Sequence, residues 1–83
     1  MTDTIVVYTT PTCPDCRNLK SWLTRLGIAF EERDLSNPAI MDEAKARTGV
    51  RVAPITIVRD QVFYGTFQYQ KAALSTILGL NEG

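Results

Sequence analysis

Two hydrophobic patterns divide the first half of the chain into strands and a helix. Residues 5–9 form a β-branched and aromatic run that Pro11 ends, which predicts a buried strand. From residue 14 to 26 the apolar side chains recur at helical spacing, and Gly27 suits the C-terminal cap of that helix. Residues 28–35 predict a second strand that becomes more polar toward its end.

A second helix is predicted near the middle of the chain. Asn37 can cap its N-terminus, Pro38 fits its first turn, and Gly49 ends it. Its inner face is expected to carry three apolar residues, Ile40, Met41 and Ala44. The chain therefore alternates strand and helix up to this point.

The last part of the chain predicts a hairpin and a third helix. The apolar runs 55–58 and 61–64 are separated only by Arg59 and Asp60, a spacing that predicts an antiparallel hairpin although this pair is not a favoured turn. Residues 68–78 predict a helix. Its apolar residues are Ala72, Leu74, Ile77 and Leu78, and Gly79 closes it.

The predicted element order is βαβαββα. A βαβ unit needs a right-handed crossover between parallel strands, and the late hairpin adds antiparallel pairing. The simplest solution is an α/β fold with a mixed four-stranded sheet flanked by three helices, similar to the thioredoxin fold. We expect residues 1–83 to form this single domain.

The composition narrows the possible partners. Nine basic and nine acidic residues cancel, and histidine is absent, so there is no basic excess for binding nucleic acid. The longest nearly apolar stretch, 72–80, is too short to span a membrane. The start of the sequence lacks the basic region of a signal peptide. We expect a cytoplasmic monomer without nucleic-acid or membrane partners.

The candidate chemistry lies in two cysteines, Cys13 and Cys16, at the junction of the first strand and first helix. In a reducing compartment such a pair favours a catalytic or metal-binding role over a structural disulfide. Pro14 disfavours helical geometry in the preceding residue and suits the first helical position, so Cys13 is expected at the N-cap. There its sulfur can accept hydrogen bonds from the amides of Asp15 and Cys16, and the helix dipole favours its thiolate.

This placement predicts that Cys13 is the nucleophile and Cys16, inside the first turn, the resolving thiol. Asp15 is expected to oppose the thiolate, because its carboxylate competes for the same amides. Two alternatives stay open. The cysteines could be inert packing residues, or they could be metal ligands. Since a zinc site needs four ligands, a metal or iron–sulfur site would have to be shared between two chains.

The sequence resembles the glutaredoxin family, including its NrdH-redoxin and mycoredoxin relatives. The resemblance rests on residues 8–16, on the tripeptide 52–54 and on the turn at 64–67. It implies a cis proline facing the cysteines, and a dithiol oxidoreductase that reduces protein or mixed disulfides. It also implies a low-molecular-weight thiol or thioredoxin reductase as electron donor, with no bound cofactor. The substrate-binding residues that it implies are Thr12, Pro14, Val52, Ala53, Pro54, Gly65 and Thr66.

The sequence departs from the family at the positions that anchor glutathione. Thr10 stands where many glutathione-using members have a lysine, a feature similar to mycoredoxin. Residues 65–68 replace their Gly-Gly pair and aspartate, while Phe67 is similar to NrdH-redoxins. We therefore expect glutathione to be a poor donor. Among the aromatic residues, Trp22 is predicted to lie in the core, whereas Tyr64 or Phe67 could line the substrate groove.

Overall fold

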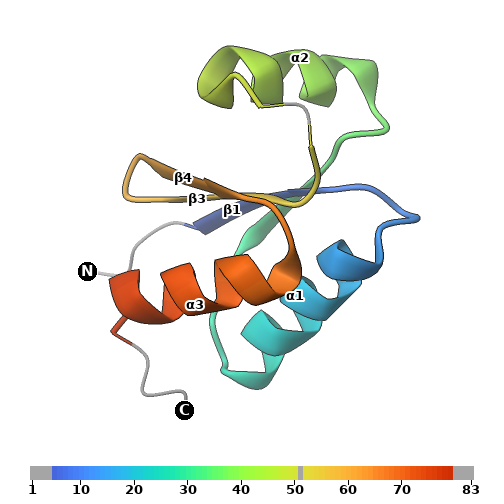
Figure 1. Ribbon diagram of the computed structural model, residues 1–83. Helices are drawn as coiled ribbons and strands as arrows, with labels where there is room; N and C mark the ends of the chain where they lie inside the picture. Colours follow the sequence, from blue (N-terminus) through green and yellow to red (C-terminus); the bar gives the residue numbers. More distant parts are fainter. Residues whose placement is uncertain (1–4, 51, 80–83) are drawn as a thin grey trace.

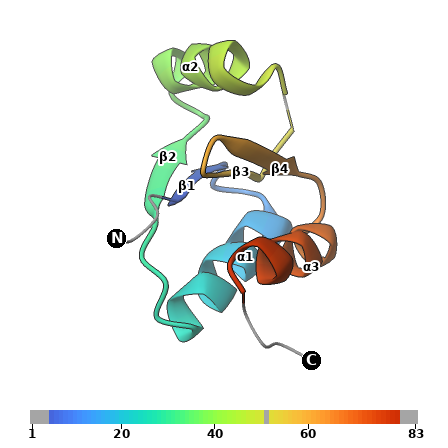
Figure 2. The same ribbon diagram turned by 90° about the vertical axis from the view of Figure 1, so that its left-hand side faces the viewer.

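The computed structural model describes residues 5–50 and 52–79 (Figure 1). Within these residues the elements are β1 (Ile5–Thr9), α1 (Pro14–Arg25), β2 (Glu31–Asp34), α2 (Pro38–Thr48), β3 (Ile55–Val58), β4 (Gln61–Tyr64) and α3 (Phe67–Ile77). The sheet has the order β2-β1-β3-β4, with β1 parallel to β2 and antiparallel to β3. Helices α1 and α3 cover one face and α2 covers the other (Figures 1 and 2). The expected thioredoxin-like fold, a mixed four-stranded sheet flanked by three helices, is confirmed.

The central strand β1 supplies side chains to two hydrophobic clusters, one on each face of the sheet. Ile5 and Val7 pack with residues of α1 and α3, whereas Val6 and Tyr8 pack on the side of α2. Every residue of β1 is buried. This continuous burial explains why its sequence is apolar at successive positions rather than at alternate ones.

The cysteine motif begins where β1 leaves the sheet and α1 starts. Cys13 is the N-cap of α1, with φ −95° and ψ 113°, and Pro14 occupies the first turn. Asn37 caps α2 in the same way through its side chain, and Gly49 ends that helix at φ 70°. The rules of helix capping therefore predicted the start of α1 and both ends of α2 correctly.

Three details of the structure differ from the sequence predictions. The second strand covers only Glu31–Asp34, because the preceding segment packs against the core beside α1 instead of pairing with β1. The amide of Ile28 donates to the carbonyl oxygen of Leu23 at 3.0 Å, which closes the end of α1. Helix α3 begins at Phe67, one residue earlier than expected, and Ala72 on it is exposed rather than buried.

A polar cluster holds α2 against the sheet. The buried Tyr8 donates a hydrogen bond of 2.6 Å from its hydroxyl to Oε2 of Glu43, and Arg47 donates to that hydroxyl at 2.9 Å. Arg33 of β2 adds an ion pair with Glu43. These polar bonds add to the apolar contacts of α2, in which Ala44 is buried and Ile40 and Met41 are partly buried.

Candidate active site

The sulfur of Cys13 lies at the N-terminus of α1. The backbone N–H of Cys16 donates a hydrogen bond of 3.1 Å to Sγ of Cys13, and both residues are free thiols. The predicted N-cap geometry is confirmed, with the Cys16 amide as the donor. A sulfur in this position faces the positive end of the helix dipole, which favours negative charge.

The two cysteines differ in their environments. Cys13 is half-buried, whereas Cys16 is only 1% exposed. Burial raises the pKa of Cys16 to about 12, and the neighbouring Cys13 side chain adds to this rise. The accessible sulfur is therefore the one at the helix cap, while Cys16 is held as a buried, protonated thiol.

The loop before β3 faces Cys13. The Ala53–Pro54 peptide bond is cis, as the family resemblance implies. The thiol of Cys13 donates toward the carbonyl oxygen of Ala53 at an S···O distance of 3.9 Å. Pro54 is buried, and Val52 is 49% exposed. Of the predicted loop residues, Ala53 is thus the one whose contact with Cys13 the structure gives.

Gln70 joins this loop to the turn between β4 and α3. Its side chain is fully buried, and Oε1 accepts a hydrogen bond of 2.6 Å from Thr56. Its Nε2 donates to the carbonyl oxygens of Pro54 at 2.8 Å and Gly65 at 3.2 Å. Sequence reasoning missed this residue. The sequence did offer a signal. Gln70 lies four residues before Leu74, so its polar side chain falls on the apolar face of the helix.

Asp15 makes a contact that the sequence did not predict. Its Oδ1 accepts a hydrogen bond of 3.1 Å from the backbone N–H of Phe67, the first residue of α3. The expected competition of this carboxylate for the amides of α1 is therefore wrong. The carboxylate reaches across to the neighbouring helix and leaves the Cys16 amide to Cys13.

The aromatic residues separate into core and surface. Trp22 is 1% exposed, as predicted, and its ring meets that of Phe67 edge-on at a centroid distance of 6.1 Å. Phe67 is half-buried against the core cluster, whereas Tyr64 is 51% exposed. Of the two candidate groove residues, Tyr64 is therefore the more exposed.

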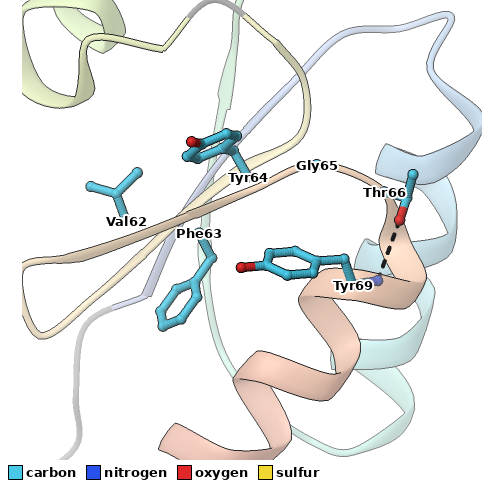
Figure 3. Close-up of a pocket in the computed structure, with 6 residues that line it drawn as sticks. All are labelled: Val62, Phe63, Tyr64, Gly65, Thr66 and Tyr69. Carbon is cyan, nitrogen blue, oxygen red and sulfur yellow. Dashed lines mark hydrogen bonds between the residues drawn. The ribbon is translucent and has the colours of Figure 1, made fainter.

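An open pocket of about 320 Å³ lies between β4 and the start of α3 (Figure 3). It is lined by Val62, Phe63, Tyr64, Gly65, Thr66 and Tyr69. The exposed ring of Tyr69 extends along β4 in this view, and Thr66 caps α3 by accepting the Tyr69 amide at 3.3 Å (Figure 3). Gly65 of the pocket lining is linked to the Pro54 loop through the hydrogen bonds of Gln70.

The remaining predicted site residues lie on the surface around this arrangement. Thr12 and Pro14 are exposed on either side of Cys13 in the chain, and Thr66 is exposed at the start of α3. Gly65 is half-buried with φ +114°, a conformation that L side chains rarely adopt, which explains the glycine. In the described residues no group of three or more histidine, cysteine or acidic side chains gathers into a metal-binding cluster. The same part of the chain contains no helix with the length and apolar character needed to cross a membrane.

Comparison with known proteins agrees with this geometry. A family model for glutaredoxin matches residues 5–63, which is more than half of the sequence and includes the cysteine motif. The chain belongs to the glutaredoxin family. Membership of this family suggests thiol–disulfide oxidoreductase chemistry.

The relatives of this glutaredoxin-family chain fall into two groups. The glutaredoxin-like protein NrdH of Lactococcus lactis subsp. lactis is 31% identical over 61 residues, covering 74% of this chain and 85% of that protein. The global transcriptional regulator Spx 1 of Oceanobacillus iheyensis is 40% identical over 42 residues, or 49% of this chain. The match spans only 32% of that regulator, so this chain covers about a third of its length.

A solved structure shows the same fold. The thioredoxin-like protein BC3987 superimposes with a TM-score of 0.78 at 27% sequence identity. The match covers 88% of this chain and 97% of that protein. The elements that position Cys13 and Pro54 therefore belong to an architecture shared with a known thioredoxin-like protein.

Proposed function

We propose that this glutaredoxin-family chain is a dithiol oxidoreductase that reduces protein or mixed disulfides. The observation that carries the proposal is the Cys13 sulfur, half-buried at the N-cap of α1, bonded to the Cys16 amide and facing the Ala53 carbonyl group. A helix N-terminus stabilises a thiolate, and partial exposure lets a disulfide reach it. The 3.1 Å contact of its amide with the Cys13 sulfur places Cys16 beside the group that it is proposed to attack.

The proposed cycle has two steps. The Cys13 thiolate attacks one sulfur of the substrate disulfide, forms a mixed disulfide and releases the other substrate sulfur as a thiolate. Cys16 then loses its proton to solvent and attacks Sγ of Cys13. This step forms the Cys13–Cys16 disulfide and releases the second substrate thiolate. The substrate gains two electrons, and the protein dithiol loses two.

The substrate-binding surface is proposed to surround Cys13. Its residues are Thr12, Pro14, Val52, Ala53, Pro54, Gly65 and Thr66. Support comes from Ala53, a half-buried residue whose carbonyl group faces Cys13 and beside which an extended substrate segment is proposed to pair as an added strand. The hydrogen bonds of Gln70 to Pro54 and Gly65 keep the two halves of this surface together.

The electron donor is proposed to be thioredoxin reductase or a low-molecular-weight thiol other than glutathione. Thr10 and the segment 65–68 lack the lysine, the second glycine and the aspartate that the resemblance associates with glutathione. Reduction of the oxidised protein by NADPH with thioredoxin reductase, by mycothiol and by glutathione should be compared directly. Efficient turnover with glutathione would contradict this part of the proposal.

Substituting each cysteine separately tests the proposed roles of Cys13 as the nucleophile and Cys16 as the resolving thiol. Cys16→Ser should accumulate a mixed disulfide through Cys13 when it is mixed with an oxidised substrate, because the second step is blocked. Cys13→Ser should form none, since Cys16 is buried. Intact-mass measurement under non-reducing conditions detects the adduct. If Cys16→Ser traps no substrate, the proposed mechanism is wrong.

The alternative function is a dimer that binds a metal or an iron–sulfur cluster through both cysteines. It predicts stoichiometric zinc or iron in the purified protein and a mass of twice the chain. Metal analysis together with size measurement separates it from the redox cycle. Stoichiometric metal with no thiol exchange would favour the dimer over the oxidoreductase.

A further inference from the structure

The carboxylate of Asp15 connects the N-termini of the two helices on the same face of the sheet. Asp15 belongs to the first turn of α1, between the two cysteines, and is half-buried. Its Oδ1 accepts the N–H of Phe67, at the start of α3, at 3.1 Å. The edge-on contact of Trp22 with Phe67 holds the same two helices together further along. The position of this negative charge relative to Cys13 is therefore fixed.

Three backbone donors around the site are satisfied by side chains of the protein itself. At α1 the Cys16 amide is bonded to the Cys13 sulfur. At α3 the Phe67 amide is bonded to Asp15 and the Tyr69 amide to Thr66. Helix N-termini commonly hold anionic groups because their first amides lack partners. Here the protein's own side chains occupy three of these amides, and one of the three acceptors is a carboxylate.

The nearby cations on α1 offset that charge only in part. Lys20 pairs with Glu32 at 2.7 Å, so much of its charge is already compensated. Arg17 is exposed, where solvent and salt screen it. A substrate that reaches Cys13 therefore meets the field of the Asp15 carboxylate.

We infer that Asp15 is a specificity-determining residue, which disfavours disulfides carrying carboxylates beside the reacting sulfur and selects those with neutral or basic flanks. This inference rests on the proposed function and deepens it by naming the class of substrate. Asp15 acts in the first step, when the Cys13 thiolate attacks a substrate sulfur and the leaving thiolate departs. A carboxylate on the substrate is repelled by Asp15 and finds the α3 amide occupied, whereas an ammonium group is attracted.

The test compares three small disulfides of similar size that differ in charge. These are dithiodipropionate, which is anionic, hydroxyethyl disulfide, which is neutral, and cystamine, which is cationic. Fully reduced protein is mixed with each one, quenched with acid and analysed by mass, so that no electron donor is needed. The measured quantity is the second-order rate constant of thiol exchange for each disulfide at low ionic strength.

Asp15→Asn is the decisive variant, because asparagine keeps an oxygen acceptor for the Phe67 amide and removes only the charge. Asp42→Asn is the matched control, since it makes the same change in net charge on an exposed residue of α2. In the native protein we expect cystamine to react fastest and dithiodipropionate slowest. Asp15→Asn should raise the anionic-to-neutral rate ratio by about tenfold, the scale of one partly screened charge pair.

The control Asp42→Asn should leave that ratio unchanged, and added salt should narrow the selectivity of the native protein. The inference is overturned if Asp15→Asn changes all three rate constants by the same factor, or if Asp42→Asn reproduces its effect. A native protein that exchanges with none of the three disulfides would instead refute the proposed function itself. The two failures are therefore distinguishable.

Discussion

The side-chain Nε2 of Gln70 donates a hydrogen bond of 2.8 Å to the carbonyl oxygen of Pro54. The same nitrogen bonds to Gly65, and the amide oxygen of Gln70 accepts from Thr56 at 2.6 Å. Because Gln70 is fully buried, water cannot replace these bonds. One side chain therefore ties α3 to both loops that face the cysteine motif.

Gln70→Leu removes these bonds while keeping a side chain of similar bulk. We expect the unfolding free energy to fall by about 1–3 kcal/mol, because buried carbonyl groups and the Thr56 hydroxyl lose partners. We also expect thiol exchange with a protein disulfide to show a raised KM, since the Pro54 loop is less well positioned. Urea unfolding of the reduced protein measures the first effect, and steady-state kinetics measures the second.

The matched control is Gln68→Leu, a change of the same kind at an exposed position on the same helix. It should alter the unfolding free energy by no more than about 0.5 kcal/mol. Equal stability of the Gln70→Leu variant and the native protein would show that the buried bonds contribute little. An unchanged KM in a destabilised variant would limit Gln70 to a structural role.

A second prediction concerns the pH dependence of the resolving step. Burial is the leading cause of the raised pKa of Cys16, and it persists when Cys13 is in a mixed disulfide, so near neutral pH only a small fraction of Cys16 is thiolate. This fraction increases about tenfold for each unit of pH. The release of a small thiol from its mixed disulfide with Cys13 should therefore accelerate about tenfold per unit between about pH 6 and pH 9.

Rapid quenching of the preformed mixed disulfide, followed by mass analysis, measures that release. The Cys16→Ser protein should release the small thiol only when an external dithiol is added, which gives the background rate. A release rate that levels off below pH 9 would mean that Cys16 is far more acidic than its burial implies.

A third prediction tests the cap that Cys13 provides for α1. In the structure Sγ of Cys13 accepts the Cys16 amide at 3.1 Å. Serine can replace this acceptor, and alanine cannot. We expect Cys13→Ala to be less stable than Cys13→Ser by about 1 kcal/mol in urea unfolding. Equal stability of the two variants would show that a side-chain acceptor at this position adds little to the stability of α1.

The parts of the fold that the sequence predicts well are those set by local rules. Pro14 and Pro38 mark the helix starts, and the cap residues before them behave as expected. The hairpin forms despite its unfavourable turn pair, with Arg59 at φ 51° and Asp60 at φ 67°. Pairing of β3 with both β1 and β4 imposes this turn, so tertiary contacts outweigh the local preference.

The unpredicted features depend on long-range contacts. The apolar pattern at residues 28–30 fits a strand, but Ile28 and Phe30 pack against the core cluster instead, and Ala29 is exposed. Asp15 meets Phe67 across 52 positions of the chain, and Gln70 meets Pro54 across 16. A polar residue on the apolar face of a helix indicates that it has a buried hydrogen-bond partner. Only the folded structure shows which residue that partner is.

The last prediction concerns the polar attachment of α2. Tyr8→Phe removes the hydroxyl between Glu43 and Arg47 and keeps the buried ring. We expect a loss of about 1 kcal/mol of unfolding free energy at neutral pH. Thiol exchange should be unchanged, because Tyr8 packs with α2 on the opposite face of the sheet from α1. Tyr64→Phe, at an exposed tyrosine, is the control and should change stability little.

The stability that Tyr8→Phe loses relative to the native protein should depend on pH. The hydrogen bond from Tyr8 is the leading cause that lowers the pKa of Glu43 below its ordinary value of 4.5. A lowered folded-state pKa contributes stability that is present above the unfolded-state value and is lost as the pH falls through the folded-state value. The stability difference between native protein and Tyr8→Phe should therefore shrink as the pH falls from 7 to below 4.5. A difference that stays constant over this range would show that the Tyr8 hydroxyl stabilises α2 without favouring the charged form of Glu43.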